Sequence, residues 1–429
     1  MRSTGPGAMG HVVLPSSSKS PNIRAMLTAT LATLLGQPEL SPYLRGIVAR
    51  GRYANAYLFH GPPGVGKGTG ALAFARAALC ERVPGAAASD QGPSLFDAAP
   101  AAAAPASDDA CGECRGCKMS ASLQHPDLRF LFPVSGEERA LEGTVEETLE
   151  KLREDPLFVF QYDKAASIRI SQTRELITEL GYRPHTASRR VVVVRDCDRM
   201  REDQFSALLK SVEEPGASTI WVLTTARLAR VPVTIRSRCQ RVRFRPLAES
   251  LVRDTLQRLA GVEEKSARVL AALAGGSLGR ALAMRDADPD IKTQRDAALA
   301  MLLPALERKP EQLWRLVQGA TGFGKVGRER LRLMLEFHQL WLRDVLRVRY
   351  GAGPDTLVNR DRAEELKKLA AGLDAPEIRR RLLVLEEALR SIDGNVSADL
   401  SLFSTLSRVA GDRLGEGAWP AHAAARWDI

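Results

Sequence analysis

A glycine-rich segment between a strand pattern and a helix pattern constrains the fold of this chain more than any other feature. Residues 54–60 (ANAYLFH) form a short apolar run typical of a buried strand, and GPPGVGK follows directly. This segment matches GxxxxGK, in which small residues let backbone N–H groups curl around phosphates while the lysine neutralises their charge. A helical run ending near Cys80 completes a strand, loop and helix unit, which predicts a P-loop domain. The candidate nucleotide-binding residues are Gly61, Pro62, Pro63, Gly64, Val65, Gly66, Lys67, Gly68 and Thr69.

Strand patterns alternate with helix patterns through the first half of the chain. Residues 190–194 (RVVVV) form a β-branched run, which is typical of a central strand buried on both faces. The alternation predicts an open parallel sheet with flanking helices and right-handed crossovers, hence an α/β class. The other predicted strands are 127–134, 219–225 and 240–245, and the predicted helices are 137–154, 170–182, 201–212 and 233–239.

The length of 429 residues exceeds what one compact domain usually holds, so two or three domains are expected. Strand patterns stop at Leu247, and helical patterns continue. Helical spacing also precedes the first strand, from Met26 to Val48. We expect a disordered arm (1–22), an α/β domain (23–246) with a flexible Ala/Pro/Ser/Asp-rich insertion (84–110), a small all-α domain (247–288), a second all-α domain (289–414) and a tail (415–429).

Composition and charge indicate where in the cell the protein is located and what kind of partner it could bind. The sequence contains no apolar run of 18 residues and no signal-peptide pattern, which predicts a cytoplasmic protein without a membrane partner. The net charge of +10 and the pI near 9.5 are compatible with a polyanionic partner such as DNA. Arginine-rich solvated helix faces account for the charge equally well, so charge alone does not establish DNA binding.

Two positions that normally bind magnesium in a P-loop domain, one after the loop and one at the end of a strand, carry residues that are unsuited to this role. Gly68 stands where Ser or Thr would bind the ion, and Thr69 is rotated from that position by about 100°. At the end of the RVVVV strand, Arg195 stands where an acidic residue is needed, and Asp196 follows it. Because a guanidinium repels a divalent cation, we expect nucleotide binding that is weak or without hydrolysis. The alternative is a shifted register in which Asp196 is the metal ligand.

Four of the six cysteines form a candidate zinc module within residues 80–117. Cys111, Cys114 and Cys117 have the spacing C-x2-C-x2-C, and Cys80 at the end of the loop helix is the preferred fourth ligand. Four thiolates leave no open position, which predicts a structural site. His125 is an alternative fourth ligand, although His125-Pro126-Asp127 fits the start of a strand better. The other two cysteines, Cys197 and Cys239, are predicted to be buried small apolar residues.

Arg238 lies between a predicted helical turn and the last predicted strand, within Ser237-Arg238-Cys239. An arginine at that edge could reach a phosphate bound by a neighbouring subunit, where a planar cation stabilises charge during phosphoryl transfer. Spacing alone favours an ordinary solvated arginine.

Taken together, these segments resemble the clamp-loader subunits of bacterial DNA polymerase III, which form a branch of the AAA+ family. Within that branch they resemble the delta-prime class. The resemblance covers roughly residues 24–290. It rests on Gly36-Gln37, AYLFHGPPGVGK (56–67), CGECRGC (111–117), His125-Pro126-Asp127, RISQTREL (169–176), FSALLKSVEEP (205–215), TIRSRC (234–239) and GSLGRAL (276–282).

The resemblance implies an AAA+ domain, a helical lid (247–288) and a helical collar (289–414) that holds a heteropentamer with delta and tau/gamma subunits. Such an assembly is part of the polymerase III holoenzyme, a nucleotidyltransferase complex, and uses ATP to place the sliding clamp on primed DNA. Arg238 would then act as an arginine finger in trans, and Arg280 would be the lid arginine near nucleotide. The departures at Gly68 and Arg195 favour the delta-prime class, with little or no ATPase of its own and at most indirect or weak clamp contact.

Two other functions compete with this one. An active ATPase of the tau/gamma type would use Asp196 and Thr69 in an unusual metal shell. A zinc-dependent DNA-binding protein would carry the P-loop as a vestige, but the sequence shows neither a reading helix nor an aromatic platform for bases.

Overall fold

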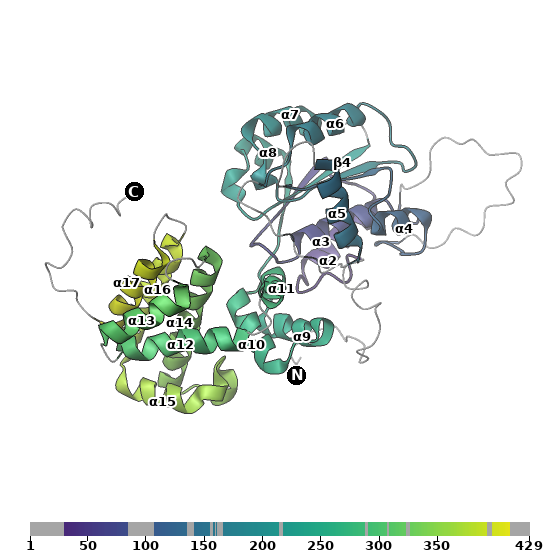
Figure 1. The fold of residues 1–429 in the computed structure, drawn as a ribbon. Coiled ribbons are helices and arrows are strands. Elements are labelled where there is room, and N and C mark those ends of the chain that lie inside the picture. Colours follow the sequence, from purple (N-terminus) through teal and green to yellow (C-terminus); the bar gives the residue numbers. More distant parts are fainter. Residues whose placement is uncertain are drawn as a thin grey trace, which may run out of the picture. The chain divides into compact units, whose positions relative to one another are not determined.

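The protein divides into two compact units, Met1–Arg245 with Arg258–Gly261, and Pro246–Gln257 with Val262–Ile429 (Figure 1). The computed structural model describes residues 30–84, 107–134, 141–154, 158, 160, 166–213, 218–287, 291–306, 309–322, 327–392 and 397–411. The predicted arm (1–22), the predicted tail (415–429) and positions 85–106 of the predicted insertion lie outside the described residues.

The first unit contains a five-stranded sheet in the order β2-β3-β4-β1-β5, with every neighbouring pair parallel. The predicted α/β class with a parallel sheet is therefore confirmed. All five residues of β3 are buried, as its β-branched sequence predicts. The strands are β1 (Ala56–His60), β2 (Leu128–Leu131), β3 (Arg190–Val194), β4 (Thr219–Thr225) and β5 (Gln240–Arg243).

Helices cover both faces of this sheet (Figure 1). Alternate residues of β1 divide between the two cores: Tyr57 and Phe59 pack toward α2 and α3, whereas Leu58 packs toward α6, α7 and α8. The helices of this unit are α2 (Leu40–Arg50), α3 (Lys67–Ala78), α4 (Arg115–Ala121), α5 (Leu141–Glu154), α6 (Ile170–Leu180), α7 (Glu202–Glu213) and α8 (Val233–Arg238), with short 3-10 turns at η2 (Cys197–Arg199) and η3 (Leu228–Arg230).

The segment before α2 differs from its helical pattern, because residues 30–39 form turns. Two constraints act there. The buried Asp109 carboxylate accepts hydrogen bonds from the backbone N–H groups of Leu31 and Ala32 at 3.0 and 2.8 Å, and Gly36 adopts a left-handed conformation with φ +64°. A side chain far away in sequence therefore fixes this segment, which local periodicity could not reveal.

Every element of regular secondary structure among the described residues of the second unit is a helix or a 3-10 turn, as the sequence predicts. Gly275 and Gly276 take φ values of +57° and +82°, which ends α10 and separates it from α11 at the predicted break. Helix α14 packs against α12, α15 and α16 around fully buried leucines such as Leu335 and Leu342. The helices are α9 (Glu249–Ala260), whose last turn from Arg258 belongs to the first unit, α10 (Glu264–Ala274), α11 (Leu278–Ala287), α12 (Ile291–Leu306), α13 (Pro310–Thr321), α14 (Arg328–Arg349), α15 (Ala363–Gly372), α16 (Ala375–Ser391) and α17 (Ala398–Ala410), with 3-10 turns η4 (Pro354–Thr356) and η5 (Arg360–Arg362).

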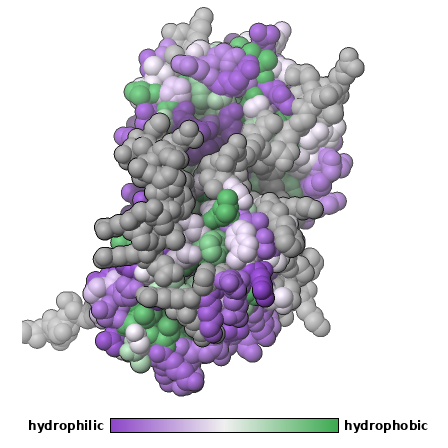
Figure 2. All heavy atoms as spheres, turned by 60° about the vertical axis from the view of Figure 1, so that its left-hand side comes forward, coloured by the Kyte–Doolittle hydropathy of each residue, from purple (hydrophilic) through white to green (hydrophobic). Residues whose placement is uncertain are grey.

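The described surface seen in Figure 2 is mainly hydrophilic, with small separate groups of hydrophobic side chains. Among the described helices, none combines the length and the apolar character that crossing a membrane requires.

Candidate functional site

The GPPGVGK segment forms a loop at the carboxyl end of β1 and leads into the first turn of α3. Gly64 and Gly66 have φ values of +69° and +94°, conformations that residues with a β-carbon rarely adopt. In open parallel sheets, ligands bind at this carboxyl edge. The loop thus has the placement and the backbone conformation of a phosphate-binding element, as the sequence predicts.

Lys67 is buried, with 5% of its surface exposed, and its ammonium group holds the loop together. Nζ donates hydrogen bonds to the carbonyl oxygens of Gly61 at 2.9 Å and Pro62 at 2.6 Å. Burial lowers the pKa of Lys67 to about 8; Asp196 opposes this shift and Arg195 adds to it. The phosphate-neutralising lysine is therefore directed at its own loop in this structure.

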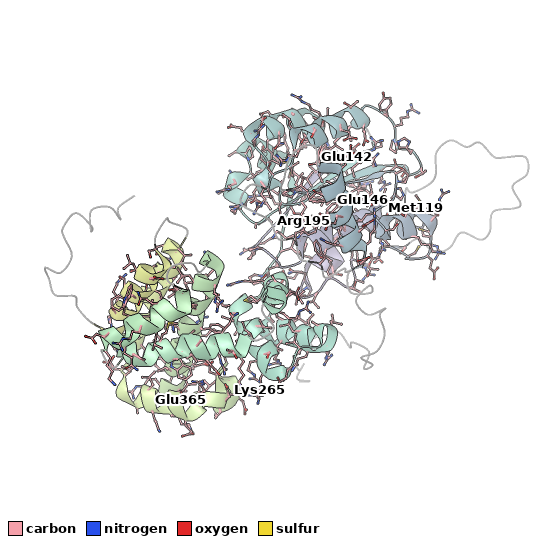
Figure 3. The ribbon with its side chains drawn as sticks, viewed as in Figure 1. Met119, Glu142, Glu146, Arg195, Lys265 and Glu365 are labelled. Atoms are coloured by element: carbon pink, nitrogen blue, oxygen red, sulfur yellow. The ribbon has the colours of Figure 1, made fainter. Side chains whose placement is uncertain are left out.

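Arg195 occupies the space that a magnesium-binding side chain at position 68 would need. A β-carbon built on Gly68 would lie 3.2 Å from Cζ of Arg195 and closer still to Nη1. The guanidinium also stacks on the Phe160 ring, with Cζ 3.9 Å from the ring centroid. Figure 3 shows where Arg195 lies in the unit. Gly68 and Arg195, the two departures noted in the sequence, therefore lie against each other in the structure. Because the group beside the loop is a cation, the residues present do not fit a magnesium ion.

Asp196 is the acidic residue that the alternative register would assign to the metal. It has a left-handed backbone with φ +47°, and its N–H donates to Oγ1 of Thr224 at 2.9 Å. Its Oδ2 lies 3.4 Å from Nε of Arg195, so its carboxylate is paired with the arginine. Thr69, the other member of that alternative, is half-buried on α3.

Asp198 is a nearby buried acid that the sequence reasoning missed. It accepts hydrogen bonds from Oγ1 of Thr225 at 2.9 Å and from Nε of Arg227 at 2.8 Å. These contacts join the end of β4 to η2, so Asp198 helps to fix the chain just after Arg195. The RDCD sequence offered a signal, because a second acid follows the strand.

The structure brings together the four cysteines predicted to bind metal. The Sγ atoms of Cys80, Cys111, Cys114 and Cys117 all lie within 4.8 Å of one another, and two pairs are separated by 3.9 and 4.0 Å. Tetrahedral zinc with Zn–S bonds of about 2.3 Å requires sulfur separations of about 3.8 Å. The donor set therefore fits a closed four-thiolate metal centre.

The surroundings of this cysteine centre match a metal-binding loop. Backbone N–H groups point at two of the sulfurs: Cys114 N lies 3.4 Å from Cys111 Sγ, and Cys117 N lies 3.3 Å from Cys114 Sγ. A hydrogen bond from the Cys117 thiol lowers the pKa of Cys80 to about 5, which favours a thiolate. Gly116 fits close to the end of α3, where a β-carbon would lie 2.5 Å from the Leu79 carbonyl oxygen.

His125 is not a member of the four-residue cluster. Its Nδ1 accepts a hydrogen bond from the Asp127 N–H at 3.0 Å, in the turn that precedes β2. Asp127 is fully buried and accepts four hydrogen bonds from residues 185–187. Burial raises the pKa of Asp127, but these hydrogen bonds outweigh it and lower the pKa overall. The sequence reasoning assigned no such role to Asp127. Cys197 and Cys239 are buried, as predicted.

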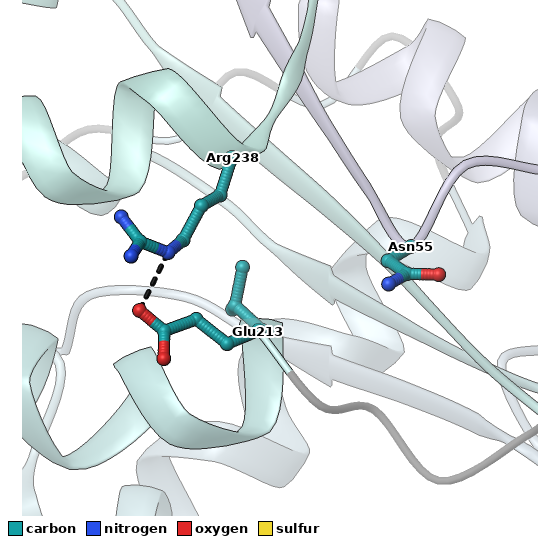
Figure 4. A pocket seen from close by; sticks show the side chains of 4 residues that line it. Asn55, Glu213 and Arg238 are labelled. Atoms are coloured by element: carbon teal, nitrogen blue, oxygen red, sulfur yellow. Dashed lines mark ion pairs between the residues drawn. The ribbon is translucent and has the colours of Figure 1, made fainter.

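Arg238 lies at the end of α8 and lines an open pocket of about 350 Å³ with Asn55, Val212 and Glu213 (Figure 4). Its Nε lies 2.5 Å from Oε1 of Glu213 on α7, and its Nη1 donates to the Thr234 carbonyl oxygen at 3.0 Å. The side chain remains 42% exposed. Glu213 therefore restrains the Arg238 guanidinium at the edge of the first unit, yet solvent can still reach it. The sequence reasoning missed Glu213 as the partner of Arg238.

Arg280 lies on α11 in the second unit and contacts groups within that unit. Its Nη2 lies 2.5 Å from both carboxylate oxygens of Glu336 on α14, and its Nη1 donates to the Leu273 carbonyl oxygen at 2.9 Å. Its role near nucleotide stays a prediction.

The known proteins to which this chain is similar include subunits of DNA polymerase III. A family model described as DNA polymerase III, delta subunit, matches residues 86–248. The chain is 25% identical to DNA polymerase III subunit delta' of Bacillus subtilis over 361 residues, which cover 84% of this chain and 92% of that relative. It is 28% identical to subunit delta' of Pseudomonas aeruginosa, covering 53% of this chain and 55% of the relative.

Subunit tau of Bacillus subtilis is also similar, with 24% identity over 59% of this chain and 36% of the relative. The chain thus spans about a third to a half of the length of two of these curated relatives. Among solved structures, a gamma subunit-related protein of Thermotoga maritima is similar with a TM-score of 0.39 and 16% identity, covering 86% of this chain and 98% of that chain.

Proposed function

This chain belongs to the clamp-loader family of DNA polymerase III subunits, and from that premise we propose that it is a delta-prime-like stator. In this role it organises a cytoplasmic complex with tau/gamma and delta subunits and lends Arg238 to the ATP site of a neighbouring subunit. The complex uses ATP to place the sliding clamp on primed DNA. The chain itself hydrolyses ATP weakly or not at all.

The observation that carries this proposal is the Arg195 guanidinium beside Gly68. A hydrolytic P-loop site uses magnesium to bridge phosphate oxygens and to neutralise the charge that develops in the transition state. Here a cation stacked on Phe160 fills the space beside the loop, within 3.2 Å of where a Gly68 side chain would begin. The positively charged Arg195 guanidinium at that point repels a magnesium ion, whereas a carboxylate would bind it.

Arg238 supports the second half of the proposal. An arginine finger must be exposed, must carry a fixed positive charge and must be held near the edge of its own domain. Arg238 meets these needs because α8 presents it beside an open pocket and Glu213 restrains its guanidinium at 2.5 Å. In the assembled complex, a phosphate of the neighbouring site would compete with Glu213 for this guanidinium.

The four cysteines serve a structural role in this proposal, with zinc as the metal. They clip the segment before β2 to the end of α3, which begins with the phosphate loop. A four-thiolate zinc site binds no water to activate, so it contributes to folding and not to catalysis.

A reconstituted loader tests the proposal. We expect no DNA-stimulated ATPase from the isolated chain, and we expect Arg238→Ala to lower the ATPase of the complex. Loss of an arginine finger costs on the order of 10³ in rate at the site it serves. Arg236→Ala, on the same helix, is the matched control and should leave the rate within about twofold, since it changes a charge at a neighbouring position without removing the finger. Unchanged activity of the Arg238→Ala complex would count against the stator role.

The similarity to tau subunits keeps an active motor as the second candidate. Magnesium-dependent ATP turnover by the isolated chain, abolished by Lys67→Ala, would establish that function and reject the stator.

A further inference from the structure

The phosphate loop retains the groups that bind phosphate but faces a guanidinium where it should face a metal ion. Its glycines Gly64 and Gly66 keep their left-handed conformations, α3 directs its first N–H groups toward the loop, and Lys67 is in place. A loop that had lost all binding would have no need for these features together. The remaining question is which form of a phosphate ligand this arrangement accepts.

We propose that this loop binds a nucleoside di- or triphosphate in its magnesium-free form, with the Arg195 guanidinium in the place of the metal. The inference concerns the chain's own loop and does not depend on the delta-prime role. It differs from a defective magnesium site, because it assigns Arg195 to the binding of nucleotide and makes magnesium unfavourable.

The position of Arg195 supports this assignment. Its guanidinium lies against the first turn of α3, with Cζ 3.2 Å from the place where a Gly68 side chain would begin, which is where a metal-binding hydroxyl would start. Phe160 supports one face of the guanidinium at 3.9 Å, and among the described residues the buried Nε makes no hydrogen bond, only the ion pair with Asp196 Oδ2 at 3.4 Å. The group is therefore oriented by stacking and by the adjacent Asp196 carboxylate at 3.4 Å, without hydrogen bonds that saturate it.

The chemistry of the guanidinium suits a bare polyphosphate. Its planar N–H donors match two phosphate oxygens at once, and its charge does not depend on pH in the physiological range. Lys67 can supply a second positive charge when its ammonium leaves the Gly61 and Pro62 carbonyl oxygens. A magnesium-chelated polyphosphate would bring a dication against Arg195, so chelation should weaken binding.

Isothermal titration of the full chain with ADP and with ATP tests the proposal, each in buffer with EDTA and in buffer with excess magnesium. We expect affinity in EDTA to exceed that in magnesium, with the larger difference for ATP. Arg195→Ala should reduce the affinity in EDTA roughly tenfold or more, because a charge-assisted contact to phosphate is lost. Arg195→Lys keeps the charge but loses the two-donor geometry, and should give an intermediate loss.

Arg189→Ala is the matched control. Arg189 precedes the same strand, β3, at its opposite end and also stacks on an aromatic ring, 4.4 Å from the centroid of Tyr53. This variant should leave nucleotide affinity unchanged, and the thermal unfolding of all variants shows whether they are folded. Arg238→Ala should likewise leave it unchanged, which separates this test from that of the stator role.

The double variant Gly68→Thr with Arg195→Asp gives the test in the opposite direction. It removes the cation and supplies the two magnesium ligands that the sequence lacks, so its binding of ATP should become stronger in magnesium than in EDTA. The proposal is overturned by wild-type binding that requires magnesium, by no binding of either nucleotide in either buffer, or by EDTA binding that Arg195→Ala leaves intact.

Discussion

Arg280 and Glu336 form an ion pair in which Nη2 lies 2.5 Å from each carboxylate oxygen. The pair joins α11 to α14 within the second unit, and Glu336 is largely buried, with 13% of its side chain exposed. Arg280 is the arginine that the family resemblance places near nucleotide. The structure therefore gives this arginine a helix-joining contact, which competes with any phosphate for the same guanidinium.

This contact predicts coupled stability effects. Arg280→Ala and Glu336→Gln should each lower the free energy of unfolding, and the double variant should cost less than the sum because both remove the same pair. For a partly exposed pair the coupling should be about 1 kcal/mol, measured by chemical denaturation in a double-mutant cycle. Arg285→Ala is the control, because its exposed partner Asp286 is adjacent in sequence and should contribute little. Strictly additive losses would show that the pair does not join the helices.

Lys67 predicts a specific dependence of stability on pH. Its pKa is lowered from 10.5 to about 8, chiefly by burial, so the folded protein binds fewer protons than the unfolded chain between these values. Stability must then rise with pH across that window, and the cost of burying the charge is fully present below pH 8. From pH 7 to 9.5 the gain from this one group should be up to about 2 kcal/mol.

Lys67→Met removes the titrating group and keeps a long side chain. Chemical denaturation at pH 7 and pH 9.5 should show a smaller rise in stability for this variant than for wild type. Equal slopes in the two proteins would mean that Lys67 keeps an ordinary pKa in the folded state.

The cysteine centre predicts one metal ion per chain. Mass spectrometry under native conditions should find one zinc, and Cys80→Ser or Cys114→Ser should lower zinc occupancy and the midpoint of thermal unfolding together. Cys239→Ala is the matched control, because this buried thiol lies outside the cluster and should leave zinc content unchanged. A chain that is equally stable after removal of zinc by chelation would contradict a structural role.

The fold could be predicted from the sequence where the signal is local. The β-branched run of β3, the GPPGVGK loop and the glycines that end α10 each determine their own structure, and their placement was predicted correctly. The helical spacing from Met26 to Val48 matches the structure within α2, whereas residues 30–39 form turns. The spacing could not reveal those turns, because the Asp109 carboxylate holds them from more than 70 positions away in sequence.

The candidate site was likewise predicted only where residue type and spacing in the sequence are enough. The motif spacing identified the four cysteines and the unsuitable residues Gly68 and Arg195, since residue type and position suffice for that. That the Arg195 guanidinium reaches the Gly68 backbone could not be predicted, because it depends on Phe160 supporting the side chain from a segment more than 30 residues away. The Glu213 partner of Arg238 was missed for the same reason: α7 and α8 approach each other only in the folded sheet.

Glu213 predicts how Arg238 is controlled, provided that Arg238 acts on a neighbouring site. The ion pair at 2.5 Å holds the guanidinium at the pocket, and the exposed Arg238 must leave it in part to reach a phosphate. Glu213→Gln keeps the shape and removes the charge, so the guanidinium should be released more easily. In the reconstituted complex we expect the KM for ATP at the served site to fall by a fewfold, which corresponds to less than about 1 kcal/mol for an exposed pair.

Epistasis separates this effect from a loss of folding. If Glu213 acts only through Arg238, then Glu213→Gln should change nothing in a complex that already carries Arg238→Ala. Glu202→Gln, at the start of the same helix α7, is the control and should leave KM unchanged in both backgrounds. A fall in KM that persists without the arginine would show that Glu213 acts by another route, whereas a rise in KM would mean that the carboxylate positions the finger and does not restrain it.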